Sequence, residues 1–94
     1  MTPGDGGGPP GSGFAYPLEY TFKILGLAAD DFPEHARRLV ARAVAEVPAE
    51  RVTVRASGAG KYLSVSVTAL LQSEAERLAV YEVLRSDPRV VFAL

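Results

Sequence analysis

This sequence contains no cysteine and no tryptophan, and it has one histidine and one methionine. Without cysteine there is no disulfide framework and no thiolate chemistry, and a zinc ion would lack its usual soft ligands. No apolar run approaches the roughly 20 residues that span a bilayer, and the start lacks the basic and apolar regions of a signal peptide. We therefore expect a cytoplasmic protein with no membrane segment, no metal and no cofactor.

An excess of charge of one sign is also missing. Lys and Arg number 10 against 11 Asp and Glu, which gives a formal net charge of −1. This balance provides no bulk attraction to nucleic acids or to membrane surfaces. At 94 residues and 48% hydrophobic composition, the chain is long enough for one domain with a modest core.

Residues 1–13 have no large apolar side chain after Met1 and consist mainly of glycine and proline. Such a segment cannot bury enough surface to offset its ordering entropy, which predicts a disordered tail. A phosphate-binding glycine loop would instead follow a strand and open a helix, and these residues lack that context. Residues 14–94 are then predicted to form the single folded domain.

Period-2 alternation and helical spacing organise the first half of this domain. The inward face of the first strand is predicted to consist of Leu18, Tyr20, Phe22 and Ile24. Gly26 ends the strand, and Asp30 or Asp31 can cap the helix that follows. Apolar residues recur along this helix as far as Val47, and Pro48 is expected to end it.

A hairpin and a second helix are predicted in the other half. A short strand over 51–55 with Val52 and Val54 inward, a glycine-rich turn over 57–60 and a long strand from 62 form the hairpin. Ser73 and Glu76 match a capping box at the start of a helix. The buried stripe of that helix is expected to be Val80, Tyr81 and Leu84. After Asp87-Pro88, the last strand is predicted to direct inward Val90, Phe92 and Leu94.

The order strand, helix, strand, strand, helix, strand predicts one architecture of the α+β class. With right-handed crossovers it gives the ferredoxin-like βαββαβ fold, a four-stranded antiparallel sheet of order 4-1-3-2 with two helices on one face.

Several short motifs carry a resemblance to a known family over residues 15–94. They are Tyr16-Pro17, Phe22-Lys23-Ile24-Leu25-Gly26, Gly60, Tyr62, Ser64-Val65-Ser66-Val67, Tyr81, Leu84, Asp87-Pro88, Val90 and Leu94. In these residues the chain resembles the YbeD-like family of small bacterial proteins. The resemblance implies a ferredoxin-like fold similar to ACT-type regulatory domains, and it brings neither an established activity nor a catalytic residue. At the hairpin the chain departs from the family, because Gly58 stands near a position that is often serine there.

The candidates for chemistry all have a simpler interpretation. His35 has no second histidine or cysteine to share a metal, so we expect a solvated helical side chain. Gly58-Ala59-Gly60-Lys61 lacks the earlier glycine, the Ser or Thr after lysine and the helix of a phosphate-binding loop, which favours a hairpin turn.

The carboxylates of the second helix alternate with arginines and predict a solvated face of mixed charge. They are Glu74, Glu76 and Glu82, with Arg77 and Arg85. Ser64 and Ser66 have no histidine base in the pattern, so nucleophilic catalysis has no support. We therefore expect that the chain is not an enzyme.

The open face of the predicted sheet is the best candidate for a site. Its predicted members are Glu19, Thr21 and Lys23; Arg51, Thr53 and Arg55; Tyr62, Ser64, Ser66 and Thr68; and Arg89, Val91 and Ala93. Four of these are cations and one is a carboxylate. From this face we select, as residues for a ligand or partner, Lys23, Arg51, Arg55, Tyr62, Ser64 and Ser66. Antiparallel sheets often leave one face in water, so a purely solvated face is the simpler alternative.

The loop over 26–32 is a second candidate, because the resemblance to ACT-type domains implies an effector site between the first strand and the first helix. Gly26 would let a ligand approach the backbone, and the helix N-terminus would offer unpaired N–H groups. Asp30 and Asp31 occupy that positive end, however, and would repel a carboxylate. We therefore predict no amino-acid binding at this loop.

The sequence as a whole favours a small non-catalytic regulatory or protein-interaction domain, with a protein partner or self-association. The alternative is a weak nucleic-acid or anion binder that uses the basic face. Nucleic acid is the less favoured partner, because RNA binding in this fold uses stacked aromatic residues and only Tyr62 is available.

Overall fold

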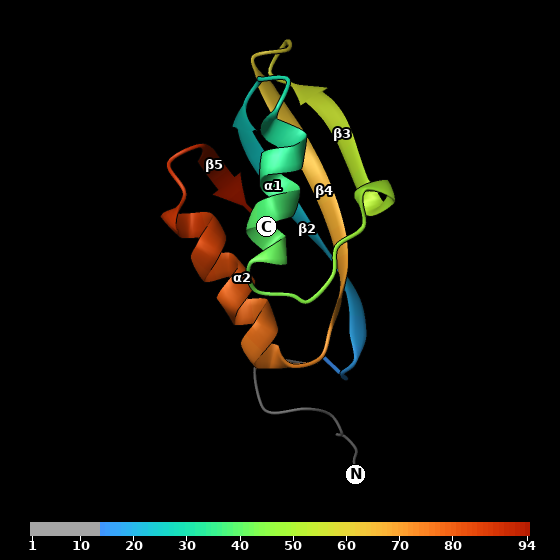
Figure 1. The fold of residues 1–94 in the computed structure, drawn as a ribbon. Helices are drawn as coiled ribbons and strands as arrows, with labels where there is room; N and C mark the ends of the chain where they lie inside the picture. The colour runs from blue at the N-terminus through green and yellow to red at the C-terminus, as the bar shows by residue number, and fades with distance from the viewer. Residues whose placement is uncertain (1–13) are drawn as a thin grey trace.

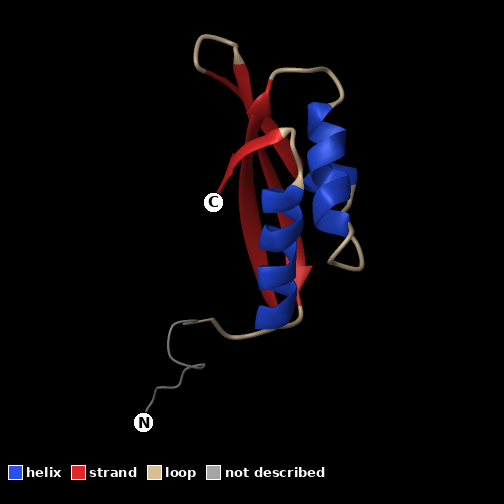
Figure 2. Ribbon diagram, turned by 90° about the vertical axis from the view of Figure 1, so that its left-hand side faces the viewer, coloured by secondary structure: helices blue, strands red, loops and turns tan. Residues whose placement is uncertain are grey.

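A four-stranded antiparallel sheet with both helices on one face makes up the described part of the chain, residues 14–94 of a computed structural model (Figures 1 and 2). The tail predicted over 1–13 lies outside the described residues. The elements in chain order are β2 (Leu18–Leu27), α1 (Phe32–Ala41), the 3-10 helix η1 (Ala49–Arg51), β3 (Val52–Ser57), β4 (Tyr62–Leu71), α2 (Glu74–Ser86) and β5 (Val90–Ala93).

The strands lie in the spatial order β3-β4-β2-β5, which is the predicted order 4-1-3-2 read from the other edge. The predicted ferredoxin-like βαββαβ fold is therefore confirmed. The long central pair β2 and β4 aligns Leu18 with Leu71 at one end and Leu27 with Tyr62 at the other. The short strands β3 and β5 form the two edges.

The core lies between the sheet and the helices. Alternate residues of β2 and β4 face the helices because successive side chains of a strand point to opposite faces. The fully buried large side chains are Phe22, Ile24, Phe32, Val40, Val65, Val67, Leu71, Val80 and Leu84. Val54 was predicted to face inward with them, but it is 44% exposed on the edge strand β3.

Helix α1 ends at Ala41, well before the predicted end at Val47. The chain then folds back as a loop in which Val44 and Val47 are still buried. The Arg37 guanidinium donates a hydrogen bond of 2.8 Å to the Val47 carbonyl and ties this loop to the helix. Helical spacing of apolar residues therefore continued past the helix itself.

The capping box at the start of α2 is confirmed in its main feature. Ser73 is the N-cap, and its hydroxyl accepts a hydrogen bond of 3.2 Å from the Glu76 N–H. The Glu76 carboxylate reaches back to accept from the Gln72 N–H at 2.8 Å. The first contact satisfies a donor that a helix start leaves without an intrahelical partner, and the second reaches the residue before the N-cap.

The hairpin turn between β3 and β4 is also confirmed. Gly58, Ala59 and Gly60 have φ values of 60°, 57° and 88°, in the left-handed region. The glycines adopt this region freely, but at Ala59 the Cβ atom makes it unfavourable. The turn closes through hydrogen bonds from the Gly60 N–H to Ser57 and from the Lys61 N–H to Gly58.

Candidate functional site

Five of the six predicted site residues lie together on the open face of the sheet. Lys23 is aligned with Ser66, and Ser64 with Arg55, while Tyr62 ends β4 beside them. Lys23 and Arg55 are exposed, and their side chains form no ion pair or hydrogen bond with the other described residues. The face therefore presents two available cations next to partly buried serine hydroxyls.

Arg51, the sixth predicted residue, is separated from this group. It lies in η1, ahead of β3, and its guanidinium contacts the Glu19 carboxylate at 3.1 Å. Both side chains are well exposed, so this is a surface ion pair of small energetic value. Its consequence for the site is the loss of one of the predicted free cations.

Tyr62 packs sideways against the hairpin turn. A Cβ atom at Gly58 would lie 3.0 Å from the Tyr62 ring, and the Lys61 ammonium lies 5.7 Å from the ring centroid. The ring is half-buried. It therefore covers the turn and interacts with a cation, in place of the open stacking platform that a nucleic-acid base would use.

The predicted orientation of β5 is wrong for Phe92 and Leu94, which were expected in the core. A β-bulge between β2 and β5 aligns Gly26 with Val90 but Leu25 with Phe92, so Val91 is the extra residue. One extra residue reverses the alternation beyond it. Ala93 faces the core instead, aligned with Ile24.

Arg89 also leaves the open face on which it was predicted. Its guanidinium lies 5.6 Å from the Phe32 ring centroid and donates to both carboxylate oxygens of Asp31, at 2.8 and 3.1 Å. With Arg51 and Arg89 both ion-paired, the open face is less basic than the sequence predicted.

The bulge brings Phe92 and Leu94 beside two leucines of β2, and we call this cluster of three exposed and one half-buried apolar side chains the apolar corner. Its members are Leu25, Leu27, Phe92 and Leu94. Leu27, Phe92 and Leu94 are 58%, 56% and 60% exposed. Leu94 joins the face because its backbone exchanges hydrogen bonds of 2.8 and 3.0 Å with Lys23. Sequence alternation alone could not identify this corner, because it counted Phe92 and Leu94 as core.

Two hollows border this surface. One of about 220 Å³ is lined by Leu27, Ala28, Ala29, Pro88, Arg89 and Val91, on the outer side of the bulge. Another of about 250 Å³ is lined by Arg55, Ala56, Ser57 and Ser64 at the β3 edge. The first is mainly apolar and the second mainly polar, so the same face can receive different groups at its two edges.

The loop over 26–32 is closed by its own side chains. Gly26 was predicted to allow close approach of a ligand, but it lies inside β2 and is buried. A Cβ atom there would overlap the Phe32 ring and lie 2.8 Å from the Arg89 carbonyl oxygen. The absence of a side chain at this position therefore accommodates Phe32 rather than a ligand.

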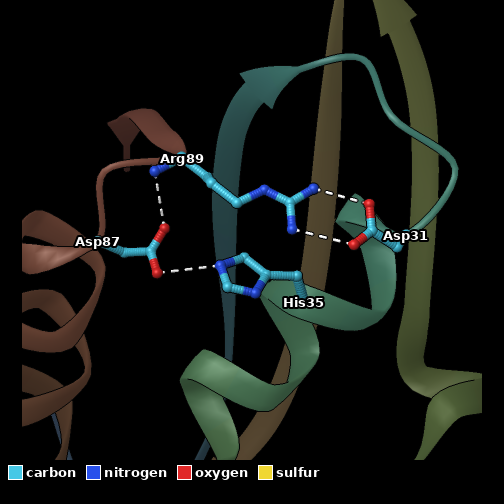
Figure 3. A network of polar contacts seen from close by, with 4 residues as sticks. All are labelled: Asp31, His35, Asp87 and Arg89. Carbon is cyan, nitrogen blue, oxygen red and sulfur yellow. Dashed lines mark hydrogen bonds and ion pairs between the residues drawn. The ribbon is translucent and has the colours of Figure 1, made fainter.

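Four polar residues join the start of α1 to the loop before β5 (Figure 3). Asp31 is the N-cap of α1, but its carboxylate accepts from Arg89 and makes no cap hydrogen bond. The Arg89 hydrogen bonds lower the pKa of Asp31. His35 was expected in solvent, but its Nε2 atom lies 3.0 Å from the Asp87 carboxylate and its side chain is only 27% exposed.

Asp87 connects the two halves of this network. One of its oxygens contacts His35, and the other accepts a hydrogen bond of 2.8 Å from the Arg89 N–H. Although partial burial opposes its ionisation, these two contacts lower the pKa of Asp87. The network therefore ties the loop before β5 to the start of α1.

An aromatic cluster around Arg77 was missed in the sequence, where Glu74 and Arg77 were predicted to be solvated. The Arg77 guanidinium lies 5.0 Å from the Phe14 ring centroid and 5.8 Å from those of Tyr20 and Tyr81. It donates to Glu74 at 2.7 and 2.9 Å and is only 17% exposed. We call this set, completed by Tyr16, the Arg77 cluster.

The tyrosines of the Arg77 cluster are part of its hydrogen bonding. Tyr16 donates to Glu74 at 2.5 Å, and the hydroxyls of Tyr20 and Tyr81 lie 3.0 Å apart. Burial raises the pKa of Tyr81, and the hydrogen bond with the Tyr20 hydroxyl raises it further. The hydrogen bonds from Arg77 and then Tyr16 lower the pKa of Glu74 to about 2. Arg85 and Glu82, on the same helix, are solvated as predicted, at 65% and 71% exposed.

Within residues 14–94, no three His, Asp or Glu side chains gather where they could share a metal ion. Neither helix of this region combines the length and apolar character of a bilayer crossing.

Comparisons with known proteins identify relatives over nearly the whole chain. The model of a family described as "Protein of unknown function (DUF493)" matches residues 12–94. The UPF0250 protein of Janthinobacterium sp. (strain Marseille) is 34% identical over 79 residues, which cover 84% of this chain and 87% of that protein. The UPF0250 protein of Xylella fastidiosa (strain 9a5c) is 30% identical over 82 residues, covering 87% and 89%. These relatives confirm the resemblance to the YbeD-like family.

A solved structure agrees with the fold. The solution structure of protein HP0495 from H. pylori is similar with a TM-score of 0.67 and 18% identity, covering 100% of this chain and 96% of that one. At this level of identity the similarity concerns the fold alone.

Proposed function

This chain belongs to the DUF493 family of proteins of unknown function, and we propose that it is a non-catalytic protein-interaction domain that docks a partner protein on its apolar corner. The observation that carries the proposal is the exposure of Leu27, Phe92 and Leu94, each more than half accessible, on one continuous part of the open face. Contiguous exposed apolar side chains rimmed by polar groups are typical of interaction sites.

The shape of the sheet around the corner supports docking. The strand β5 is an edge strand of four residues, so the corner is open on its outer side as well as on its face. The apolar hollow of about 220 Å³ continues the corner past Leu27 and Val91. A hydrophobic side chain of a partner could therefore contact Phe92 and also enter this hollow, as anchoring residues do in protein interfaces.

The charges beside the corner favour a partner other than a second copy. Among residues 14–94, Lys23 and Arg55 form no ion pair with an Asp or Glu side chain, and two copies that met through this face would bring the same cations into one interface. A partner that supplies carboxylates would neutralise them. We therefore commit to a different protein that offers apolar and acidic side chains together.

The proposal of a non-catalytic domain agrees with the contacts of the other polar side chains, which interact with one another within the fold. His35 is engaged by Asp87, and Glu74 by Arg77 and Tyr16. The alternative function, a weak nucleic-acid or anion binder on the basic face, has lost support because Arg51 and Arg89 are ion-paired. Its remaining cations are those that the protein partner would use.

Selection of peptides tests this proposal. A random peptide library displayed on phage is selected against the wild-type protein, a Phe92→Ser/Leu94→Ser variant and a Leu70→Ser/Leu78→Ser control. Leu70 and Leu78 are 51% and 53% exposed, which is similar to the exposed fractions of the corner residues, but they lie outside the corner. We expect wild type and control to enrich the same peptides and the corner variant to enrich none of them.

Two results would contradict the proposal. Equal enrichment by the corner variant would place docking elsewhere. A wild-type dimer in sedimentation equilibrium that becomes a monomer in the corner variant would identify a second copy as the occupant.

A further inference from the structure

One row of side chains crosses the whole open face from the apolar edge to the cationic edge. Backbone alignment places Phe92 of β5 beside Leu25 of β2, Leu25 beside Ser64 of β4, and Ser64 beside Arg55 of β3. The row thus changes from hydrophobic to polar to cationic over the width of the sheet. Neighbouring strands lie about 4.8 Å apart, so the backbones of Phe92 and Arg55 are separated by about 14 Å.

The cationic end of this row has hydrogen-bond donors arranged around a hollow in which an anion could bind. Arg55 lines the hollow of about 250 Å³ together with Ser57 and Ser64. Its guanidinium has several N–H donors with no acceptor among the described residues, and each serine hydroxyl adds one more donor. A planar carboxylate can accept from such a guanidinium through both oxygens. Lys23, in the next row and two strands from Arg55, adds a second positive charge to the same face.

We propose that the partner binds across the strands through an acidic amphipathic segment, with an apolar side chain on Phe92 and Leu25 and a carboxylate on Arg55. This inference rests on the proposed function and adds the chemistry and direction of the bound segment. The distance from Leu25 to Arg55 is about two strand spacings, or about 10 Å, which two turns of an α-helix also span. Peptides that place an acidic residue about seven positions from a leucine or phenylalanine fit this row.

Charge reversal at the cationic end tests the inference separately from docking itself. The same displayed library is selected against wild type, Arg55→Glu and a matched control, Arg85→Glu. Arg85 lies on α2, outside the open face, and has an exposed side chain. We expect wild type and Arg85→Glu to select peptides with Leu or Phe and an Asp or Glu. Arg55→Glu should select peptides in which Lys or Arg replaces the acidic residue.

A synthetic peptide from the wild-type selection provides the quantitative test. Replacing its Asp or Glu by the amide should weaken binding to wild type about tenfold, as expected for one charge-assisted hydrogen-bonded pair. The same replacement should leave the affinity for Arg55→Glu unchanged or improve it. Amide shifts on binding should extend over both Phe92 and Arg55.

The possible failures are distinguishable. Peptides that are purely apolar and shift only the residues of the apolar corner would overturn this inference and leave the proposed function intact. Enrichment of no peptide by wild type would overturn both. Single-stranded nucleic acid that competes with the selected peptide in physiological salt and loses affinity in Arg55→Glu would overturn the inference in favour of a phosphate ligand.

Discussion

Two regions at opposite ends of β2 combine aromatic rings with an arginine, and they differ in what surrounds them. In the Arg77 cluster the guanidinium lies among three rings and holds Glu74, with 17% of its side chain exposed. At the other end, Phe92 is 56% exposed, and the Arg55 side chain has no ion pair or hydrogen bond with any of residues 14–94. Similar side chains therefore stabilise the fold in one region and stay available in the other.

Coverage by neighbouring segments explains the difference. Helix α2 carries Arg77 and Tyr81 to the first half of β2, and Phe14 and Tyr16 approach from the segment before that strand. The second half of β2 meets β5, whose bulge turns Phe92 to the face without helices. Figure 2 shows both helices on the other side of the sheet. The comparison predicts that mutations in the Arg77 cluster reduce stability and mutations in the apolar corner reduce binding.

The largest expected effect tests this contrast directly. Arg77→Ala should lower the free energy of unfolding by about 2 kcal/mol, because Glu74 and the tyrosines lose a shielded cationic partner. Phe92→Ser should change it by less than about 1 kcal/mol, because the side chain is already mostly in water. Urea denaturation of both variants measures the difference, with Arg85→Ala as an exposed control on α2. A larger loss for Phe92→Ser than for Arg77→Ala would reverse the comparison.

The contribution of the Arg77 cluster to the free energy of unfolding should depend on pH more strongly than that of the apolar corner. The pKa of Glu74 is lowered to about 2 from an ordinary value of 4.5, so the unfolded chain binds this proton first as the pH falls. The contribution of Glu74 is therefore present above about pH 5 and is lost progressively toward its folded pKa of about 2. Glu74→Gln should be less stable than wild type near neutrality, and the difference should shrink as the pH is lowered.

Urea denaturation at a series of pH values between neutrality and acid measures this change. Phe92→Ser adds and removes no titratable group, so its difference from wild type should stay constant over the same range. If the difference in unfolding free energy between Glu74→Gln and wild type is also constant with pH, the Glu74 carboxylate does not stabilise the fold through its contact with Arg77.

The smallest expected effect concerns the turn that borders the open face. Ala59 has a φ of 57°, a conformation that glycine adopts without the steric conflict of a Cβ atom. Ala59→Gly should raise the free energy of unfolding by about 0.5–1 kcal/mol. Binding of the selected peptides should be unchanged, since no residue of the turn belongs to the apolar corner. Thermal denaturation checks the sign, and a lower midpoint would contradict the interpretation of strain at this residue.

Much of the fold was predictable because it depends on local patterns. Alternation in β2 and β4 placed Phe22, Ile24, Val65 and Val67 in the core, and they are fully buried. The capping residue Ser73 began α2 as expected. In these segments the apolar pattern within one strand or helix predicts which of its residues are buried, because an element with one apolar face buries that face.

The site was less predictable, because its residues depend on pairing between distant segments. Lys23, Arg55, Tyr62, Ser64 and Ser66 were found on the open face from alternation alone. The ion pairs of Arg51 with Glu19 and of Arg89 with Asp31 were not predicted, because each partner comes from another element. The bulge opposite Gly26 could not be read from β5 by itself, because an inserted residue is defined only by the register of two strands.

The sequence by itself determined the order of the elements, the two-layer architecture and the core of β2, β4 and α2, because hydrophobic periodicity is a local property. Only the tertiary structure decided that Arg77 is enclosed by rings from Phe14, Tyr20 and Tyr81. It also decided that Phe92 and Leu94 lie on the open face. Both outcomes depend on which side chains meet across segments far apart in the chain, and such contacts have no periodic signal within either segment.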